Sequence, residues 1–233
     1  MGKNRYIYLV NKQINKILTF LSENGISISQ NFTSCNVKTH TITWDNFQNL
    51  TFTLKDLSYE DIYKTCKERG DYNFLLIDKA FIQMKYDFDN RGNSIIGHVL
   101  GYYPNVLEKL EKEINEEYQE ELQNDSKGIT DNDNSLFKRI LERKVTPFPI
   151  RFDYSQTHNE IIHPKVHLTL GNYLDCRIPV AKPIMPYQFV SFILRNFYFD
   201  LFQKFNISSE LINDIRFNEE ITEKEKELFH INF

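Results

Sequence analysis

The stretch from residue 74 to residue 104 constrains the fold most, because the polarity of its side chains alternates. Residues 82–88 read IQMKYDF, in which every second side chain is apolar. Successive side chains of a β-strand point to opposite faces, so this pattern predicts a strand with one apolar and one polar face. The sequence DNRG at 89–92 predicts a turn, and the residues up to Pro104 predict a returning strand. We therefore expect one long strand from residue 74 to the turn, and a half-exposed antiparallel hairpin.

Further strands are predicted on both sides of this hairpin. Alternating polarity and residues of high β propensity mark each of them, and turn residues separate them. The predicted segments are 34–44, 50–54, 147–155, 163–173 and 176–180. Together with the hairpin they predict a mainly antiparallel sheet built from two hairpin-like blocks.

Helices are predicted at both ends of the chain. Residues 6–24 place apolar side chains at helical spacing, and Ser58 begins a capping box for a helix that Gly70 closes. Residues 187–205 are apolar around most of the circumference of a helix, which predicts burial on several sides. The sequence shows no internal repeat and no linker, so residues 1–233 are expected to form a single α+β domain.

The segment between the two sheet-forming blocks is strongly charged. Residues 105–123 predict a charged helix, and residues 124–135, rich in Asn, Asp and Ser, predict a mobile loop. The densest group of positive charges follows, at Lys138, Arg139, Arg143 and Lys144. This basic cluster is a candidate to contact nucleic-acid phosphates. The cluster is explained equally well as the basic face of a helix whose charges complement those of the preceding acidic helix.

Composition excludes several classes of protein. The chain has 233 residues, 41% of them hydrophobic, and a formal net charge of −4, so it is expected to be globular and to have no global attraction to nucleic acid or an anionic membrane. Its longest apolar runs are far shorter than the roughly 20 residues that cross a bilayer, and its N-terminus does not resemble a signal peptide. The three cysteines are widely spaced, which argues against a disulfide framework. We therefore expect a cytoplasmic protein without a membrane partner.

Three of the six histidines lie within ten positions of one another: His158, His163 and His167. Residues advance by about 3.3 Å along a strand, so His163 and His167 would be about 13 Å apart on one regular strand. The ligands of one ion must lie about 2 Å from it, and the spacing matches no metal-binding motif. We therefore predict no metal site and no cofactor. His158 is expected in a connecting loop, His163 at the start of a strand and His167 on the face of that strand. Pro164 favours a loop end at His163, which would allow His163 to converge with His158 but leaves His167 inside the strand.

Pairing of the strands around Asp153 and His167 would bring polar side chains together. The register that opposes these two residues also opposes Arg151 to Thr169, and it gathers the apolar side chains on the other face. A carboxylate beside an imidazole fixes its tautomer and raises its pKa, as in many general acids and bases. His167 and Asp153 are therefore candidate catalytic residues, and Arg151 and His163 are candidates to stabilise a phosphate charge. The alternative is a cross-strand pair that only satisfies polar groups beneath a covering helix.

Other side chains extend this candidate site. Lys165 is a further candidate to stabilise a phosphate charge. Cys176 is a candidate nucleophile, although a cysteine in a strand is more commonly a buried structural residue. If the two hairpins share one sheet, His98, Lys85 and Asp87 extend the same polar surface. The sequence contains no nucleophile elbow, phosphate-binding loop or dinucleotide-binding motif.

Two stretches resemble an uncharacterised bacterial family of domains of unknown function. The first reads LLIDKAFIQMKYDFDNRGNSIIGHVLGYYP, and the second combines RFDY, HPKVHLTLG, CRIPV and FILRNFY. The resemblance covers about residues 74–104 and 147–198. Such families are often encoded near mobile or antiphage defence genes, so the resemblance implies a bacterial accessory or effector subunit and names no activity. In its β-rich core followed by a histidine-bearing segment and a helix, the chain is also similar to small toxins of toxin–antitoxin pairs.

Three functions are compatible with these features. The resemblance and the lack of a complete catalytic motif favour a non-enzymatic accessory subunit of an antiphage defence or nucleic-acid-processing complex, with a protein partner encoded in the same operon. The pair of His167 and Asp153 favours a metal-independent ribonuclease-like toxin or effector. A nucleotide or small-molecule sensor would use the same polar face as its binding pocket.

Overall fold

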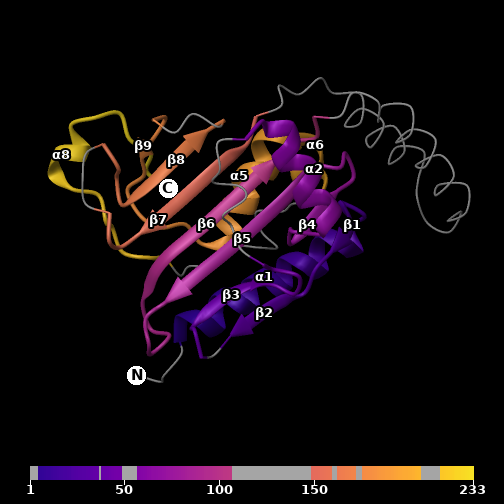
Figure 1. The fold of residues 1–233 in the computed structure, drawn as a ribbon, viewed down its shortest axis with the longest axis horizontal. Coiled ribbons are helices and arrows are strands. Elements are labelled where there is room, and N and C mark those ends of the chain that lie inside the picture. The colour runs from indigo at the N-terminus through magenta and orange to yellow at the C-terminus, as the bar shows by residue number, and fades with distance from the viewer. Residues whose placement is uncertain are drawn as a thin grey trace, which may run out of the picture.

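A nine-stranded antiparallel sheet organises the chain (Figure 1). The computed structural model describes residues 5–36, 38–48, 57–106, 148–158, 162–171, 175–205 and 216–233. The strands are β1 (Ser27–Gln30), β2 (Thr33–Asn36), β3 (Thr41–Trp44), β4 (Phe74–Leu76), β5 (Phe81–Phe88), β6 (Ile95–Tyr103), β7 (Ile150–Ser155), β8 (Val166–Leu170) and β9 (Ile178–Pro179). Their order across the sheet is β1-β4-β5-β6-β7-β8-β9, and β2 joins it through β3, which pairs with β5. With helices near both ends, the structure confirms the predicted α+β class.

The central strands β5 to β8 form successive antiparallel pairs. The predicted turn between β5 and β6 is confirmed, and Asp89 closes it because its Oδ1 accepts hydrogen bonds from the backbone N–H groups of Asn93 and Ser94 at 2.7 and 3.1 Å. Residues paired across neighbouring strands share a face of the sheet. The alternation of polarity on one strand therefore continues across all four.

One face of the sheet carries the main hydrophobic core. The helices α1 (Arg5–Glu23), α5 (Pro186–Phe197) and α6 (Phe199–Lys204) pack against it. Phe152 of β7 is fully buried there, and its ring contacts that of Phe189 on α5 with centroids 6.0 Å apart. In Figure 1, α5 lies behind the central strands and α1 runs beside β1, β2 and β3.

The opposite face is covered at one end by α2 (Tyr59–Arg69), which packs on a second, smaller apolar cluster. In this cluster the ring of Phe81 on β5 stacks on the ring of Tyr103 on β6, with centroids 4.7 Å apart. The predicted caps of α2 are confirmed: Ser58 accepts a hydrogen bond from a backbone N–H of the first turn, and Gly70 ends the helix with φ of 64°. Beyond this cluster the same face carries polar side chains.

Two of the predicted strands are hairpins instead. Residues 34–44 form β2, a turn and β3, because Asn36 accepts hydrogen bonds from two backbone N–H groups of the turn and His40 adopts φ of 53°. Residues 74–88 divide into β4 and β5, which pair with each other around Lys79 at φ of 64°. Neither turn contains the Gly or Pro that marks a turn in a sequence, because His40 and Lys79 supply the positive φ.

The predicted helix at 187–205 is divided in two at Tyr198, whose φ of −134° and ψ of 46° are not helical. The buried Tyr198 hydroxyl donates a hydrogen bond to Asp78 at 2.7 Å, which holds the break against the turn between β4 and β5. The C-terminal part contains the short helix α8 (Glu223–Lys226). Val180 and Ile231 then form a parallel bridge at the β9 edge of the sheet.

Several predictions fall on residues outside the described ranges. These are the strand at 50–54, the charged helix beyond residue 106, the loop at 124–135, and the basic cluster of Lys138, Arg139, Arg143 and Lys144. Their predicted structure and contacts stay predictions. Among the helices of the described ranges, none combines the length and apolar character that crossing a membrane requires.

Candidate functional site

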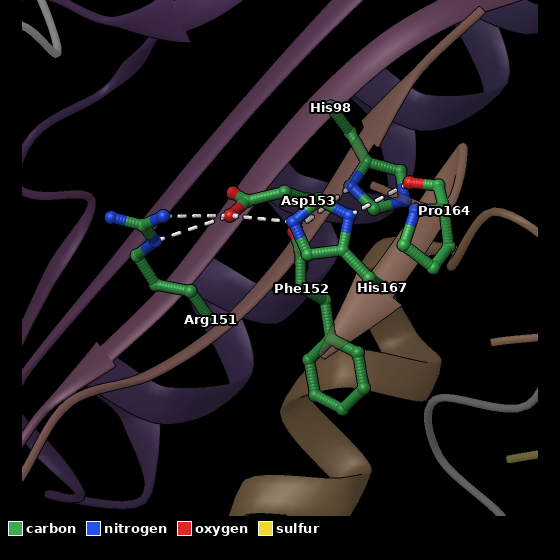
Figure 2. Close-up of polar contacts among 6 residues, drawn as sticks. All are labelled: His98, Arg151, Phe152, Asp153, Pro164 and His167. Atoms are coloured by element: carbon green, nitrogen blue, oxygen red, sulfur yellow. Dashed lines mark hydrogen bonds and ion pairs between the residues drawn. The ribbon is translucent and has the colours of Figure 1, made fainter. Parts of the chain in front are cut away.

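The predicted register of β7 and β8 is confirmed. Asp153 lies opposite His167, and Arg151 lies opposite Thr169. Burial alternates along β7, so its polar side chains face away from the main core. Figure 2 shows that Arg151, Asp153 and His167 lie in one line, with the carboxylate between the guanidinium and the imidazole.

Arg151 and Asp153 form a largely buried ion pair on β7. Because they are two positions apart on a strand, they share a face. Oδ2 of Asp153 accepts hydrogen bonds from Nη2 and Nε of Arg151 at 2.8 and 3.3 Å, and the two side chains are 17% and 15% exposed. Oδ1 of Asp153 is buried and accepts no hydrogen bond within the described part of the chain. The positive charge of the guanidinium thus offsets the negative charge of the carboxylate that faces the imidazole of His167.

Both ring nitrogens of His167 face protein groups. Nδ1 lies 3.0 Å from the carbonyl oxygen of Pro164, which only accepts, so Nδ1 carries the proton and donates it. Nε2 lies 3.7 Å from Oδ2 of Asp153, and His167 is only 3% exposed. Burial lowers the pKa of His167 and outweighs the opposing effect of Asp153. His167 is therefore a neutral imidazole enclosed by protein.

The three histidines of the 158–167 segment are not separated as predicted. The strand β8 begins only at Val166, so the strand spacing assumed between His163 and His167 does not apply. The ring centroids of His163 and His167 are 5.0 Å apart, and those of His158 and His163 are 3.7 Å apart. The polar line of Figure 2 thus continues through His163 to His158.

His163, like His158, is a partly exposed histidine of this line. His167 is buried beside it. Burial, with the neighbouring His158 and Arg177, lowers the pKa of His163 to about 4, so its ring is neutral at pH 7. Within the described ranges, no three His, Cys, Asp or Glu side chains are placed to hold one metal ion.

The sequence left open that His163 converges with His158, because Pro164 favours a loop end at His163, and the structure brings the two rings together. The confirmed register pairs Asp153 with His167, and the backbone of Ser155 donates to Lys165 at 3.0 Å. Extending this register beyond the ends of the strands sets His163 beside the residues just before His158. The two histidines meet because antiparallel strands bring the two ends of their connection together.

His98 does not belong to the polar surface, contrary to the prediction. It pairs with Tyr86 and Tyr154, which face the main core, whereas Lys85 and Asp87 share the face of Asp153. The backbone N–H of Ile184 donates to Nε2 of His98 at 3.1 Å, so Nδ1 carries the proton and donates to the carbonyl of Phe152 at 3.1 Å. Complete burial lowers the pKa of His98 to about 4. His98 is a structural link between β6, β7 and the segment before α5.

The remaining candidates are placed as follows. Lys165 lies 3.3 Å from Glu220, with which it forms an ion pair. Cys176 precedes β9, and the residue of β9 that lies opposite His167 is Pro179. Lys85 and Asp87 extend the polar face on β5 as predicted, where they form an ion pair with each other.

Residues 26–233 match a family described as "Uncharacterized conserved protein (DUF2290)". The chain belongs to the DUF2290 family. This confirms the predicted membership of an uncharacterised family, and the match extends well to the N-terminal side of the stretches that carried the resemblance. No curated protein and no solved structure matches the chain. The DUF2290 description names no activity, so the function of the polar line has to be argued from its geometry.

Proposed function

We propose that this DUF2290 chain is a non-enzymatic subunit of a protein assembly. The placement of His167 supports this most. A general base needs a ring nitrogen within about 2.6–3.2 Å of the proton that it takes from the substrate. One nitrogen of His167 is bound to Pro164, the other faces Asp153, and the ring is 3% exposed. This geometry suits a polar contact that joins β7, β8 and their connection.

The charges of the polar face support the same proposal. Three cations of the face in the described residues lie beside anions, in the pairs Lys85–Asp87, Arg151–Asp153 and Lys165–Glu220. Affinity for nucleic-acid backbones comes mainly from cations that neutralise phosphates. A face whose charges are offset within the protein suits a protein partner better than a phosphate backbone.

The kind of assembly is proposed from the resemblance. Families of this type are encoded near mobile or antiphage defence genes, which favours a bacterial defence or nucleic-acid-processing complex. In such a complex the basic cluster of Lys138, Arg139, Arg143 and Lys144 would contact nucleic acid while another subunit supplies the chemistry. The partner would be encoded in the same operon.

The proposal predicts a stable partner in the native host. A tagged chain expressed from its own locus is expected to co-purify with a protein encoded beside it, and both should elute together in size-exclusion chromatography. Nuclease treatment of the extract is the control, because a partner held by direct contact remains bound after it. Recovery of the chain only as a free monomer would contradict the proposal.

A metal-independent ribonuclease is the second candidate, and the position of His163 favours it. This partly exposed imidazole lies 5.0 Å, between ring centroids, from His167, which in turn faces Asp153. As the proton acceptor of such a site, His163 would contribute about 100-fold or more to the rate. His163→Ala is therefore expected to slow RNA cleavage by that factor, measured with purified protein under single-turnover conditions.

The control for this experiment is His230→Ala, because His230 lies near the C-terminus and its Nδ1 contacts only the local carbonyl of Leu228 at 3.1 Å. The control should cleave at the wild-type rate. Cleavage should also persist in excess chelator, since this mechanism uses no metal. Equal activity or equal toxicity of wild type, His163→Ala, His167→Ala and Asp153→Ala would remove all three residues from the mechanism.

A further inference from the structure

His158 and His163 form a stacked pair at the two ends of the connection between β7 and β8. Their ring centroids are 3.7 Å apart, and the ring planes are inclined by 40°. Only four residues separate the two histidines in the sequence. The pair therefore joins the last residues after β7 to the first residues before β8.

The two rings are close enough to become ligands of one ion if they turn apart. In a tetrahedral site with metal–nitrogen distances of 2.0–2.1 Å, two imidazole nitrogens lie about 3.3 Å from each other. The ring centroids of such a ligand pair lie about 5 Å apart, farther than the 3.7 Å between the stacked rings of His158 and His163, so the rings turn apart to bind the ion. Two neighbouring imidazoles thus reach a shared ion by rotation of their side chains, without a change of the backbone.

A second observation concerns Nδ1 of His158. This atom is buried and has no hydrogen-bond partner within the segments that the structure describes. A buried polar atom without a partner is costly, so such atoms usually have a partner in a native protein. A ligand bound beside His163 would supply one.

We propose that His158 and His163 bind a divalent transition-metal ion of the zinc, nickel or copper type. Imidazole nitrogens are ligands that these metals favour. His167 is not counted as a third ligand, because no three His, Cys, Asp or Glu side chains of the described ranges are placed to hold one ion. Water completes the coordination, so the ion is exchangeable and links the ends of the connection.

The inference does not depend on the proposed accessory function. It does exclude the ribonuclease candidate in its stated form, because a metal bound to His163 removes the free nitrogen that this mechanism requires. The prediction of no metal site rested on the separation of His163 and His167 along a strand and on the lack of a metal-binding motif. The observed distances between the rings remove the first of these arguments.

Titration of the full chain, free of any polyhistidine tag, with Co²⁺, Zn²⁺ and Ni²⁺ tests the proposal. Isothermal titration calorimetry should give about one ion per chain for each metal, and bound Co²⁺ should show visible absorption. His158→Ala and His163→Ala are each expected to weaken binding at least about tenfold. His230→Ala, which removes a histidine elsewhere, should leave the affinity unchanged.

A second variant separates metal ligation from ring packing. His163→Phe keeps an aromatic ring against His158 but removes both nitrogens, so it should keep the thermal unfolding temperature measured without metal and lose the metal. Wild-type affinity in His163→Phe, or the absence of metal binding by the wild type, would overturn the proposal.

Discussion

Replacing Phe152 with alanine is expected to lower the free energy of unfolding by about 3–5 kcal/mol. Phe152 is fully buried at the centre of the sheet, and its ring contacts Phe189 and Phe192 of α5 and Phe233 at the end of the chain, with centroids 5.5–6.0 Å apart. Truncation removes contacts to three separate rings and leaves a cavity. Because β7 is paired with β6 on one side and β8 on the other, the backbone cannot move in to fill the cavity. Urea unfolding followed by circular dichroism measures the loss.

Phe229→Ala is the matched control for this substitution. It makes the same chemical change at a side chain that is 79% exposed, so the free energy of unfolding should change by less than about 0.5 kcal/mol. A loss below about 1 kcal/mol for Phe152→Ala would contradict the packing of α5 and the C-terminal residues on this face.

The stability of the protein is expected to fall as the pH is lowered from about 6.5 to about 4, and His98 is a main cause. Complete burial lowers the pKa of His98 to about 4, whereas the ordinary value of a histidine is about 6.5. Between these values the unfolded chain binds a proton that the folded chain does not, so the free energy of unfolding decreases with falling pH. This shift amounts to about 3 kcal/mol at pH 4 relative to pH 7.

His98→Gln tests this assignment. Glutamine keeps an acceptor for the N–H of Ile184 but does not titrate, so the variant should lose about 1–3 kcal/mol at pH 7 and show a flatter dependence between pH 6.5 and 4. Urea unfolding at several pH values measures both effects. His230→Gln should keep the wild-type slope. Parallel curves for His98→Gln and wild type would show that protonation of other groups produces the acid sensitivity.

The polar line of the site was predictable as far as it depends on the alternation of side chains. Once β7 and β8 pair antiparallel, the register that buries their apolar side chains leaves Asp153 opposite His167. The alternation of polar and apolar side chains therefore predicts, from the sequence alone, that Arg151, Asp153 and His167 share one face. For the same reason Lys85 and Asp87 were assigned to the correct face.

The error on His98 shows where this reasoning ends. Whether His98 faces the core or the polar surface depends on its register against β5 and β7, and the β5–β6 pairing contains an irregularity next to the turn. A shift of one residue moves a side chain to the other face. This register is set by the geometry of the turn between β5 and β6, which the sequence around His98 does not predict.

The sequence by itself determined the fold class, the hairpin of β5 and β6, and the two faces of β5, β7 and β8, because side-chain periodicity is a local property of the backbone. Only the tertiary structure decided what the histidines can do. The ring nitrogens of His167 and His98 are engaged by carbonyl, N–H and carboxylate groups, and those that engage His98 lie far from it in the chain. His163 and His158 meet because antiparallel strands bring the ends of their connection together. These contacts set the proton affinity, the solvent access and the metal binding of the histidine rings. The periodicity of the sequence carries no information about such contacts.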